Sequence, residues 1–260
     1  MRFAVFASGR GSNFQALLNA KDQGRLPEAE FVLLFSDKAT AAALERAQTA
    51  GIATCHLNPK DYADRAAYET EVLECLKKHE IEAICLAGYM RLVGKTLLEA
   101  YPHRILNIHP ALLPAFPGMH GQLDALEYGV KVSGCTVHFV DEGVDTGPII
   151  LQKTVPVLDD DTVVSLSKRI LEQEHLAYAE AVRSESAIQL QDLPPVILES
   201  LRGEQVPGAR PSIDRSHTTQ SEQDRLLQAL RRHRWRRNAA AAELGISRST
   251  LWRKMREFGL

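Results

Sequence analysis

The sequence predicts an α/β protein with a Rossmann-like, mostly parallel sheet, followed by a small all-α module. Across residues 1–185, short apolar runs alternate with segments of helical periodicity, a pattern typical of parallel strands joined by crossover helices. A stretch rich in proline and polar residues follows, which favours a linker over residues 186–220. From Ser221 the periodicity is helical throughout. We therefore expect a first domain at 1–185, a linker and a C-terminal domain at 221–260.

Composition narrows the class of protein. The 260 residues are 45% hydrophobic and 25% charged, as in ordinary globular proteins. No run approaches the roughly 20 apolar residues that cross a bilayer, and the N-terminus enters a strand pattern without the apolar stretch of a signal peptide. The four cysteines have no C-x-x-C spacing. We expect reduced thiols in a cytoplasmic protein that uses no metal and contacts no membrane.

The charge is distributed unevenly along the chain. Residues 219–260 contain ten Lys/Arg and four Asp/Glu, a net charge of +6. The preceding 218 residues contain 21 Lys/Arg and 29 Asp/Glu, a net charge of −8. A basic tail on an acidic body predicts two modules with different partners.

Six runs of the first domain are strand candidates, because each is short, apolar and β-rich. In chain order they are Arg2–Ala7, Glu30–Phe35, Ala83–Leu86, Arg104–Ile108, Thr136–Val140 and Pro148–Val155. Five segments have apolar residues at helical spacing and are helix candidates. They are Asn13–Lys21, Ala39–Ala50, Arg65–His79, Lys95–Tyr101 and Asp161–Val182. A turn-rich segment, D-E-G-V-D-T-G-P, joins the last two strands directly.

The segment I-L-N-I-H-P-A-L-L-P, residues 105–114, gives the strongest indication of a site. Side chains at i and i+2 of a strand point to the same face, so Asn107 and His109 should project side by side before Pro110 stops the ladder. An open α/β sheet presents such polar strand ends at its ligand crevice. The amide can donate to a developing oxyanion and the imidazole can carry a proton near neutral pH, which favours catalysis. A core histidine is the alternative.

Asp145 is the third catalytic candidate. It lies in the turn between the last two strands, which should sit near the carboxyl edge of the sheet. A carboxylate beside an imidazole favours the imidazolium, so Asp145 should raise the pKa of His109. An ordinary hairpin residue is the alternative, since Asp and Gly are common in turns.

The segment S-G-R-G-S-N, residues 8–13, follows the first strand and opens a helix. Its glycines allow close approach of a ligand, and free N–H groups at a helix start favour an anion such as phosphate. Phe14 occupies the position of the third glycine of the dinucleotide fingerprint, but Asp37, 26 residues past Gly11, can imitate the ribose-binding acid. A nicotinamide enzyme is therefore a competing interpretation, and a turn without a ligand is another.

Together these segments resemble the phosphoribosylglycinamide formyltransferase family, the folate-dependent transformylases of purine synthesis. The resemblance covers about the first 185 residues and its segments occur in the family's order. They are S-G-R-G-S-N, A-G-Y-M-R-L-V (87–93), I-L-N-I-H-P-A-L-L-P-A-F-P-G (105–118), G-C-T-V-H-F-V-D-E-G-V-D-T-G-P-I-I (134–150) and L-E-Q-E-H (171–175). The resemblance implies the formyltransferase fold, 10-formyltetrahydrofolate as cosubstrate and glycinamide ribonucleotide as substrate.

The resemblance also implies a role for each matching residue. The catalytic trio would be Asn107, His109 and Asp145. The folate would contact Arg65, Met90, Arg91, Leu92, Val93, Asn107, Asp141, Glu142, Gly143, Val144 and Asp145. Glycinamide ribonucleotide would contact Gly11, Ser12, Asn13, Leu171, Glu172, Gln173 and Glu174. Of these, the first three would surround the phosphate through their backbone, and the last would meet the amine or the sugar hydroxyls.

The chemistry of formyl transfer suits this trio. The substrate amine attacks the formyl carbon and produces a tetrahedral oxyanion, which Asn107 and a protonated His109 would stabilise. Asp145 would keep the ring charged and oriented while it relays a proton toward the folate nitrogen. One departure lies nearby, because Gln122 and Leu123 stand where the family often has a second histidine and a polar residue.

The end of the chain has the pattern of a helix-turn-helix. Ala241 and Gly245 allow close packing and a turn, and Ser247 can cap a second helix. The polar face of that helix supplies the candidates for DNA contact, Arg248, Thr250 and Arg253. This segment resembles the Fis-type domain of bacterial transcription activators, which dimerises, so the resemblance implies DNA and a homodimer as partners. A solvated helical hairpin is the alternative.

Three functional interpretations remain open at this point. The main one is a cytoplasmic formyltransferase fused to a DNA-binding module. The second is a transcription regulator whose degenerate formyltransferase domain senses a metabolite, with Gln122 as its first sign of decay. In the third, the tail serves only for dimerisation.

Overall fold

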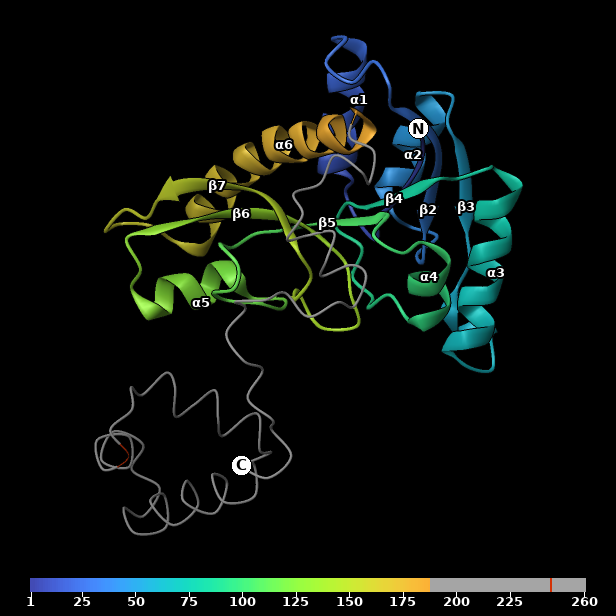
Figure 1. The fold of residues 1–260 in the computed structure, drawn as a ribbon. Helices are drawn as coiled ribbons and strands as arrows, with labels where there is room; N and C mark the ends of the chain where they lie inside the picture. The colour runs from blue at the N-terminus through green and yellow to red at the C-terminus, as the bar shows by residue number, and fades with distance from the viewer. Residues whose placement is uncertain (188–243, 245–260) are drawn as a thin grey trace, which may run out of the picture. The chain divides into compact units, whose positions relative to one another are not determined.

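The computed structural model describes residues 1–187 and residue 244 (Figure 1). The described part is an α/β unit around one seven-stranded sheet. Its strands are β1 (Arg2–Phe6), β2 (Glu30–Ser36), β3 (Ala53–His56), β4 (Ala83–Leu86), β5 (Ile105–His109), β6 (Val132–Phe139) and β7 (Ile149–Pro156). Its helices are α1 (Ser12–Asp22), α2 (Ala42–Thr49), α3 (Arg65–Lys78), α4 (Lys95–Ala100), α5 (Gly121–Tyr128) and α6 (Val163–Ala187), with a 3₁₀ turn η1 (Pro59–Asp61).

The sheet has the strand order β3-β2-β1-β4-β5-β6-β7. The first five strands in sequence are parallel, so their carboxyl ends meet at one edge. β6 then runs antiparallel to β5, and β7 antiparallel to β6. The predicted mostly parallel, Rossmann-like sheet is therefore confirmed, with an antiparallel pair at one side.

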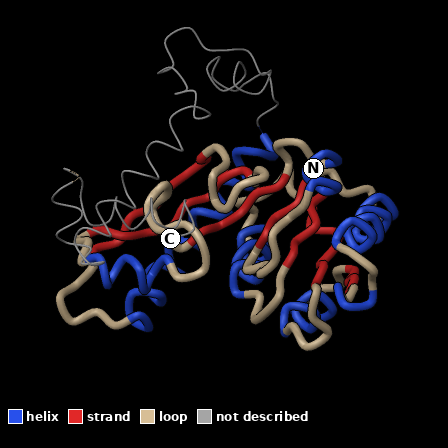
Figure 2. Tube along the Cα trace, turned by 90° about the horizontal axis from the view of Figure 1, so that it is seen from below, coloured by secondary structure: helices blue, strands red, loops and turns tan. Residues whose placement is uncertain are grey.

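Alternating side chains of β1 build two cores, one on each face of the sheet. Phe3 and Val5 belong to a cluster that α1, α2 and α6 cover. Ala4 and Phe6 belong to a second cluster that α3 and α4 cover. Because both faces are buried, the central strands read as continuous apolar runs in the sequence. Figure 2 shows the helices on either side of the strands.

All six predicted strands and all five predicted helices are present, with shifted ends. Two regular elements were missed, the edge strand β3 and the helix α5. β3 has four mostly exposed residues, so it lacks the apolar signal of a central strand. α5 begins with Gly121 and has only two buried residues, so its periodicity is weak.

Helix α6 is longer than predicted and passes the expected domain boundary at residue 185 by two residues. It begins at Val163, directly after Thr162, whose hydroxyl accepts the Ser165 N–H and so caps the first turn. The expected linker and C-terminal domain lie outside the described residues, and with them Arg248, Thr250 and Arg253. Within the described part, no helix has the length and apolarity needed to cross a membrane.

Candidate active site

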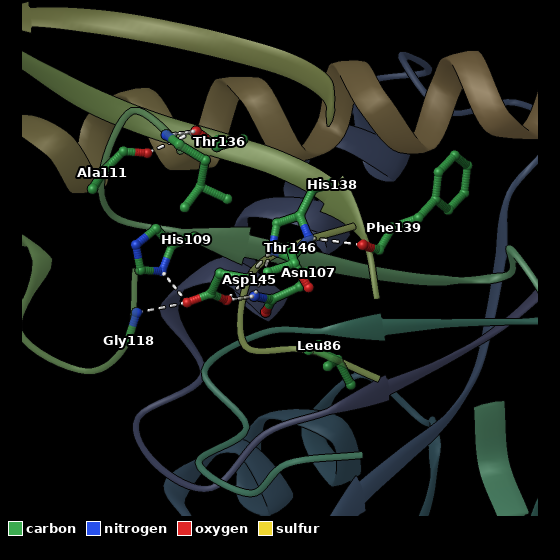
Figure 3. A network of polar contacts seen from close by, with 12 residues as sticks. Leu86, Asn107, His109, Ala111, Gly118, Thr136, His138, Phe139, Asp145 and Thr146 are labelled. Atoms are coloured by element: carbon green, nitrogen blue, oxygen red, sulfur yellow. Dashed lines mark hydrogen bonds and ion pairs between the residues drawn. The ribbon is translucent and has the colours of Figure 1, made fainter. Parts of the chain in front are cut away.

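Asn107 and His109 share one face of β5, as predicted, and both side chains contact Asp145. The antiparallel register sets Asn107 opposite His138 and His109 opposite Thr136 on β6. His109 is only 3% exposed. Figure 3 shows the Asp145 carboxylate between the imidazole and the amide. Residues 38 positions apart in the chain therefore form one polar cluster.

The Asp145 carboxylate has four partners around the site, of which His138 is described below. Its Oδ2 lies 3.3 Å from His109 Nδ1 and accepts the Gly118 N–H at 2.8 Å. Its Oδ1 accepts a long bond of 3.4 Å from Asn107 Nδ2. Asp145 has a positive φ of 55°, which places it in a conformation uncommon for a residue other than glycine. The carboxylate thus holds the imidazole from one side and the loop at Gly118 from the other.

The route by which Asp145 reaches the site differs from the prediction. The turn was expected at the carboxyl edge of the sheet, but the antiparallel direction of β6 starts it at the opposite end of β5. The Val140 N–H donates to the carbonyl of Ile105, the first residue of β5. The turn then folds back until Asp145 meets His109, the last residue of β5.

His138 belongs to the cluster and was not among the predicted site residues. It is 2% exposed, and its Nδ1 lies 2.7 Å from the Phe139 carbonyl oxygen; in the tautomer that donates this bond, Nε2 is an acceptor. That Nε2 accepts from Asn107 Nδ2 at 3.1 Å and lies 3.5 Å from Asp145 Oδ1. The alternation of Thr136 and His138 in the β6 sequence is a signal that could have pointed to this residue once β6 was paired with β5.

The protonation of His109 corrects the expectation drawn from the sequence. Burial lowers the pKa of the ring below its ordinary value, although the Asp145 carboxylate and the Phe116 carbonyl both favour the charged form. Asp145 thus acts on the His109 pKa in the predicted direction, but burial outweighs it and the net shift is downward. Burial also raises the pKa of Asp145, but contacts with His138, the Gly118 N–H and His109 outweigh it and leave the pKa lowered. The lowered pKa favours the neutral form of a ring whose two nitrogens both face acceptors, Asp145 and the Phe116 carbonyl, of which a neutral ring can donate to only one.

A loop and a helix close over the second ring nitrogen. His109 Nε2 lies 2.8 Å from the Phe116 carbonyl oxygen. Gly121, the first residue of α5, packs so closely that a Cβ there would lie 3.1 Å from this same oxygen and 3.4 Å from Nε2. The glycine at this position lets α5 approach the imidazole.

The turn at residues 8–13 has the geometry expected of an anion site. Gly11 has a φ of 71°, and a Cβ there would lie 2.7 Å from the Cβ of Ala43. Both facts require glycine. Helix α1 then starts at Ser12 with no side chain capping its N–H groups. Free N–H groups and the positive end of the helix dipole face this turn, which suits a phosphate.

Asn13 and Glu174 meet across 161 positions of sequence. The Asn13 Nδ2 donates to Glu174 Oε2 at 2.8 Å, both residues are buried, and Asn13 Oδ1 has no partner among the described residues. Burial raises the pKa of Glu174, and the bond from Asn13 opposes that rise. The other predicted substrate residues of α6, Leu171, Glu172 and Gln173, lie on the same helix, with Glu172 exposed.

Residues 88–94 lie between β4 and α4 and contain the predicted folate contacts at 90–93. Met90 is 60% exposed and Leu92 is 62% exposed, so this segment presents apolar side chains to solvent. Arg91 lies over the Tyr68 ring, and Val93 packs against the core. Predicted folate contact Arg65 donates to the Leu92 carbonyl and pairs with Glu69, so here it supports the segment from α3.

The loop at residues 141–145 is shaped by one aspartate. Asp141 Oδ1 accepts the Gly143 N–H at 3.1 Å and the Thr146 hydroxyl at 2.7 Å. Glu142 and Val144 are exposed. The loop therefore presents the apolar side chain of Val144 next to Asp145, the acid of the trio.

The surroundings of Asp37 and Gln122 bear on two alternative interpretations, a nicotinamide enzyme and a metabolite sensor. Asp37 is 9% exposed and accepts the Ser8 hydroxyl at 2.6 Å, so its carboxylate is engaged rather than open to a ribose. This disfavours the nicotinamide interpretation. Gln122 lies on α5, and none of the hydrogen bonds around the trio in the described chain involves it.

Two separate parts of the sequence match known families. Residues 1–182 match the family described as "Formyl transferase", and residues 219–258 match "Bacterial regulatory protein, Fis family". All the site residues discussed above lie in the first match. The expected linker lies between the two matches.

Named relatives and solved structures cover the same part of the chain. A protein of Bacillus subtilis (strain 168), phosphoribosylglycinamide formyltransferase, is 48% identical over 182 residues, which are 70% of this chain and 93% of that protein. The trifunctional purine biosynthetic protein adenosine-3 of Drosophila melanogaster is also 48% identical over 182 residues, but these are only 14% of its length. Glycinamide ribonucleotide transformylase 1 from Symbiobacterium toebii superposes with a TM-score of 0.70 at 51% identity, covering 72% of this chain and 88% of the other. The phosphoribosylglycinamide formyltransferase from Bacillus halodurans gives 0.70 at 47% identity, covering 73% and 98%.

Proposed function

We propose a specific reaction for this chain, which belongs to the formyl transferase family: it transfers a formyl group from 10-formyltetrahydrofolate to the amine of glycinamide ribonucleotide, a step of purine biosynthesis. The resemblances seen in the sequence, to formyltransferases and to the Fis-type domain, are both confirmed. The observation that carries the proposal is the Asp145 carboxylate in contact with both Asn107 and His109.

The lowered pKa of His109 changes how the trio would work. A neutral ring can first accept a proton, whereas a ring charged in advance cannot. When the substrate amine attacks the formyl carbon, the new C–N bond leaves a positive nitrogen and a negative oxygen. His109 takes the proton from that nitrogen, and Asp145 stabilises the resulting imidazolium. The bond to the folate nitrogen then breaks, and His109 returns the proton to that nitrogen.

This relay requires a defined tautomer of His109. The ring proton must sit on Nδ1, where Asp145 accepts it, so that Nε2 is free to take the amine proton. The contact between Nε2 and the Phe116 carbonyl is then given up when substrate enters. Asn107 keeps its bond to His138 and exchanges the longer bond to Asp145 for the oxyanion.

The substrates are assigned to the remaining predicted residues. The free N–H groups at Gly11–Asn13 suit the phosphate of glycinamide ribonucleotide, and the buried Glu174 suits its amine or hydroxyls. The exposed side chains of Met90, Leu92 and Val144 suit the apolar faces of a pterin ring. We also assign the folate to Arg65, Arg91, Val93, Asp141, Glu142 and Gly143, and the nucleotide to Leu171, Glu172 and Gln173.

A formyl-transfer assay with both substrates tests the proposal directly. We expect turnover by the wild type and its loss in His109→Ala. The matched control is His56→Ala, which removes an exposed histidine at the sheet edge and should leave turnover intact. Binding of both ligands with no turnover in the wild type would instead support the metabolite-sensor interpretation. The contacts of the trio, none of whose hydrogen bonds in the described residues involves Gln122, favour the enzyme.

For the C-terminal module we propose DNA binding through a helix-turn-helix, with Arg248, Thr250 and Arg253 at the interface. The support is the match to the Fis family and the net charge of +6 over residues 219–260. Fluorescence anisotropy of the full chain with promoter duplexes tests it. We expect Arg253→Ala to weaken binding and to reduce the salt slope by about 1, as one phosphate contact is lost. If the wild type and Arg253→Ala bind the duplex equally poorly at low salt, dimerisation remains as the role of the tail.

The setting of the protein follows from the same proposal. We place the enzyme in the cytoplasm, where its substrates are made and where the free thiols of Cys55, Cys75, Cys85 and Cys135 stay reduced. A homodimer formed through the C-terminal module would present two recognition helices to one DNA site.

A further inference from the structure

Segment 88–94 is held at both ends by buried carboxylates that lie outside the catalytic trio. At its start, the Met90 N–H donates to the Ser8 hydroxyl at 3.0 Å, and that hydroxyl donates to Asp37 at 2.6 Å. At its end, the Gly94 N–H donates to Glu69 at 2.6 Å. Both acids are nearly inaccessible to solvent. Buried carboxylates with specific partners fix geometry, because leaving any of these polar groups unpaired is costly.

Ser8 makes two separate contacts with this segment. Its N–H donates to the Gly88 carbonyl at 3.0 Å, and its hydroxyl accepts from Met90 N–H. A serine hydroxyl has one proton, and Asp37 takes it, which leaves the lone pairs of the oxygen for Met90. The acid therefore orients the hydroxyl toward the segment. Ser8 itself is 5% exposed, so water does not compete for these bonds.

Ser8 also begins the turn that leads to the phosphate site. The next two residues are fixed to α2: Ala43 N–H donates to the Gly9 carbonyl, and the Arg46 guanidinium donates to the Arg10 carbonyl. The chain from Ser8 to the phosphate-facing Gly11 is thus short and has bonded neighbours on both sides. Only Gly9 and Arg10 separate Ser8 from Gly11, so the two segments are linked through a short stretch of chain.

We propose that Ser8, oriented by Asp37, is a positioning residue that couples the phosphate turn to segment 88–94, so that binding of the nucleotide phosphate tightens the folate pocket. This rests on the proposed function, because it assigns the two ligands to these two segments. Coupling of this kind is reciprocal, so the folate tightens nucleotide binding by the same factor.

The other end of the segment supplies a contrast. Glu69 and Arg65 reach Gly94 and the Leu92 carbonyl from α3, with no bond to the phosphate turn. Loss of Glu69 therefore loosens the folate pocket without touching the link to the nucleotide. Loss of Ser8 removes the link itself.

The test measures by calorimetry the dissociation constant of tetrahydrofolate, which has no formyl group to transfer, with and without saturating glycinamide ribonucleotide. For the wild type we expect the nucleotide to tighten folate binding about fivefold or more. In Ser8→Ala this factor should fall close to one. Ser36→Ala is the matched control, since Ser36 is a buried serine at the end of β2 whose hydroxyl bonds only within its own turn, to Lys38. It should keep the wild-type factor, and Glu69→Gln should weaken folate binding but keep the factor.

Two further measurements keep the outcome decisive. Asp37→Asn still accepts from Ser8 and should retain part of the coupling, which guards against a variant that fails to fold. Amide exchange at Met90 should be faster in Ser8→Ala than in the wild type, because its acceptor is gone. If the wild type turns over and Ser8→Ala keeps the wild-type ratio of folate dissociation constants, this inference is overturned while the proposed function stands. Absence of turnover and of binding in the wild type would overturn the proposed function.

Discussion

His109 Nδ1 lies 3.3 Å from Asp145 Oδ2, and the same oxygen accepts the Gly118 N–H at 2.8 Å (Figure 3). One carboxylate oxygen therefore fixes both the ring and the loop that closes over it. Burial nevertheless lowers the pKa of the ring below its ordinary value. In the mechanism that we propose, the pair stabilises a proton that arrives during the reaction.

The first prediction concerns pH and Asp145→Asn. Since neutral His109 is the reacting form, kcat/KM should fall on the acid side, as pH drops from the ordinary histidine value of about 6.5 toward the lowered pKa. Removing the Asp145 charge lowers that pKa further and moves the acid limb to lower pH. It also destabilises the transient imidazolium, so kcat should drop at every pH. A pH–rate profile of both proteins measures this.

The sign for stability follows from the same shift. The folded pKa of His109 lies below the unfolded one, so its contribution to stability is present above about pH 6.5 and is lost as pH falls through the folded pKa.

A rate that instead declines as pH rises through neutrality would contradict the neutral-ring mechanism, because the protonated ring would then be the reacting form.

The second prediction is that Asn107→Ala loses most of kcat. The amide is the donor best placed for the oxyanion, and removing one such donor typically costs about 10²–10³ in rate. Steady-state kinetics should show the loss in kcat with a smaller change in KM. Asn19→Ala, an exposed amide on α1, is the control and should behave as the wild type. Near-normal turnover in Asn107→Ala would remove Asn107 from the oxyanion role.

Local rules of sequence, together with the family resemblance, were enough to name Asn107, His109 and Asp145 as candidate catalytic residues, although the turn that carries Asp145 was expected at the other end of β5. The i and i+2 rule put Asn107 and His109 on one face, and turn chemistry placed Asp145 in a loop between strands. The phosphate turn followed from glycine spacing at a strand-to-helix junction. Each of these inferences needs only neighbouring residues.

What the sequence did not reveal depends on long-range contacts. His138 enters the site only through the register of β6 against β5, which no local pattern specifies. The protonation of His109 was mispredicted because the sequence shows the acid but not the burial, and burial is the larger effect. The bond from Asn13 to Glu174 joins α1 to α6, so it follows from the packing of the finished fold.

The third prediction is that Gly121→Ala impairs catalysis more than stability. A Cβ at this position would press on the Ala111 Cβ, the Phe116 carbonyl and His109 Nε2 at 3.1, 3.1 and 3.4 Å. Each neighbour must shift by a few tenths of an ångström, and the gain in helix propensity offsets part of the strain. We expect a change in unfolding free energy within about 1–2 kcal/mol. We expect kcat to fall about tenfold, since a small displacement of a catalytic group is enough.

Urea denaturation and kinetics of the same preparation separate the two effects. Glu127→Ala, on the exposed side of α5, is the control for a change in helix propensity. Full activity in Gly121→Ala would show that the approach of α5 does not position His109.

The fourth prediction concerns Glu174→Gln, for which stability and substrate binding should change in opposite directions. Burial raises the folded pKa of Glu174 above its ordinary value of 4.5. Its contribution to stability is therefore full below about pH 4.5 and declines as pH rises through the folded pKa, because the buried charge is then present. Glutamine keeps an acceptor for Asn13 without that charge, so the variant should unfold at higher urea than the wild type at pH 7, with the difference vanishing near pH 4.

The KM of Glu174→Gln for glycinamide ribonucleotide should rise tenfold or more, since a hydrogen bond to a charged group contributes about 1.5–3 kcal/mol. Lys168→Gln removes a charge from the exposed side of the same helix and should change neither quantity. A variant that loses stability at pH 7 and binds the nucleotide normally would mean that Glu174 is a structural partner of Asn13 and not a substrate ligand.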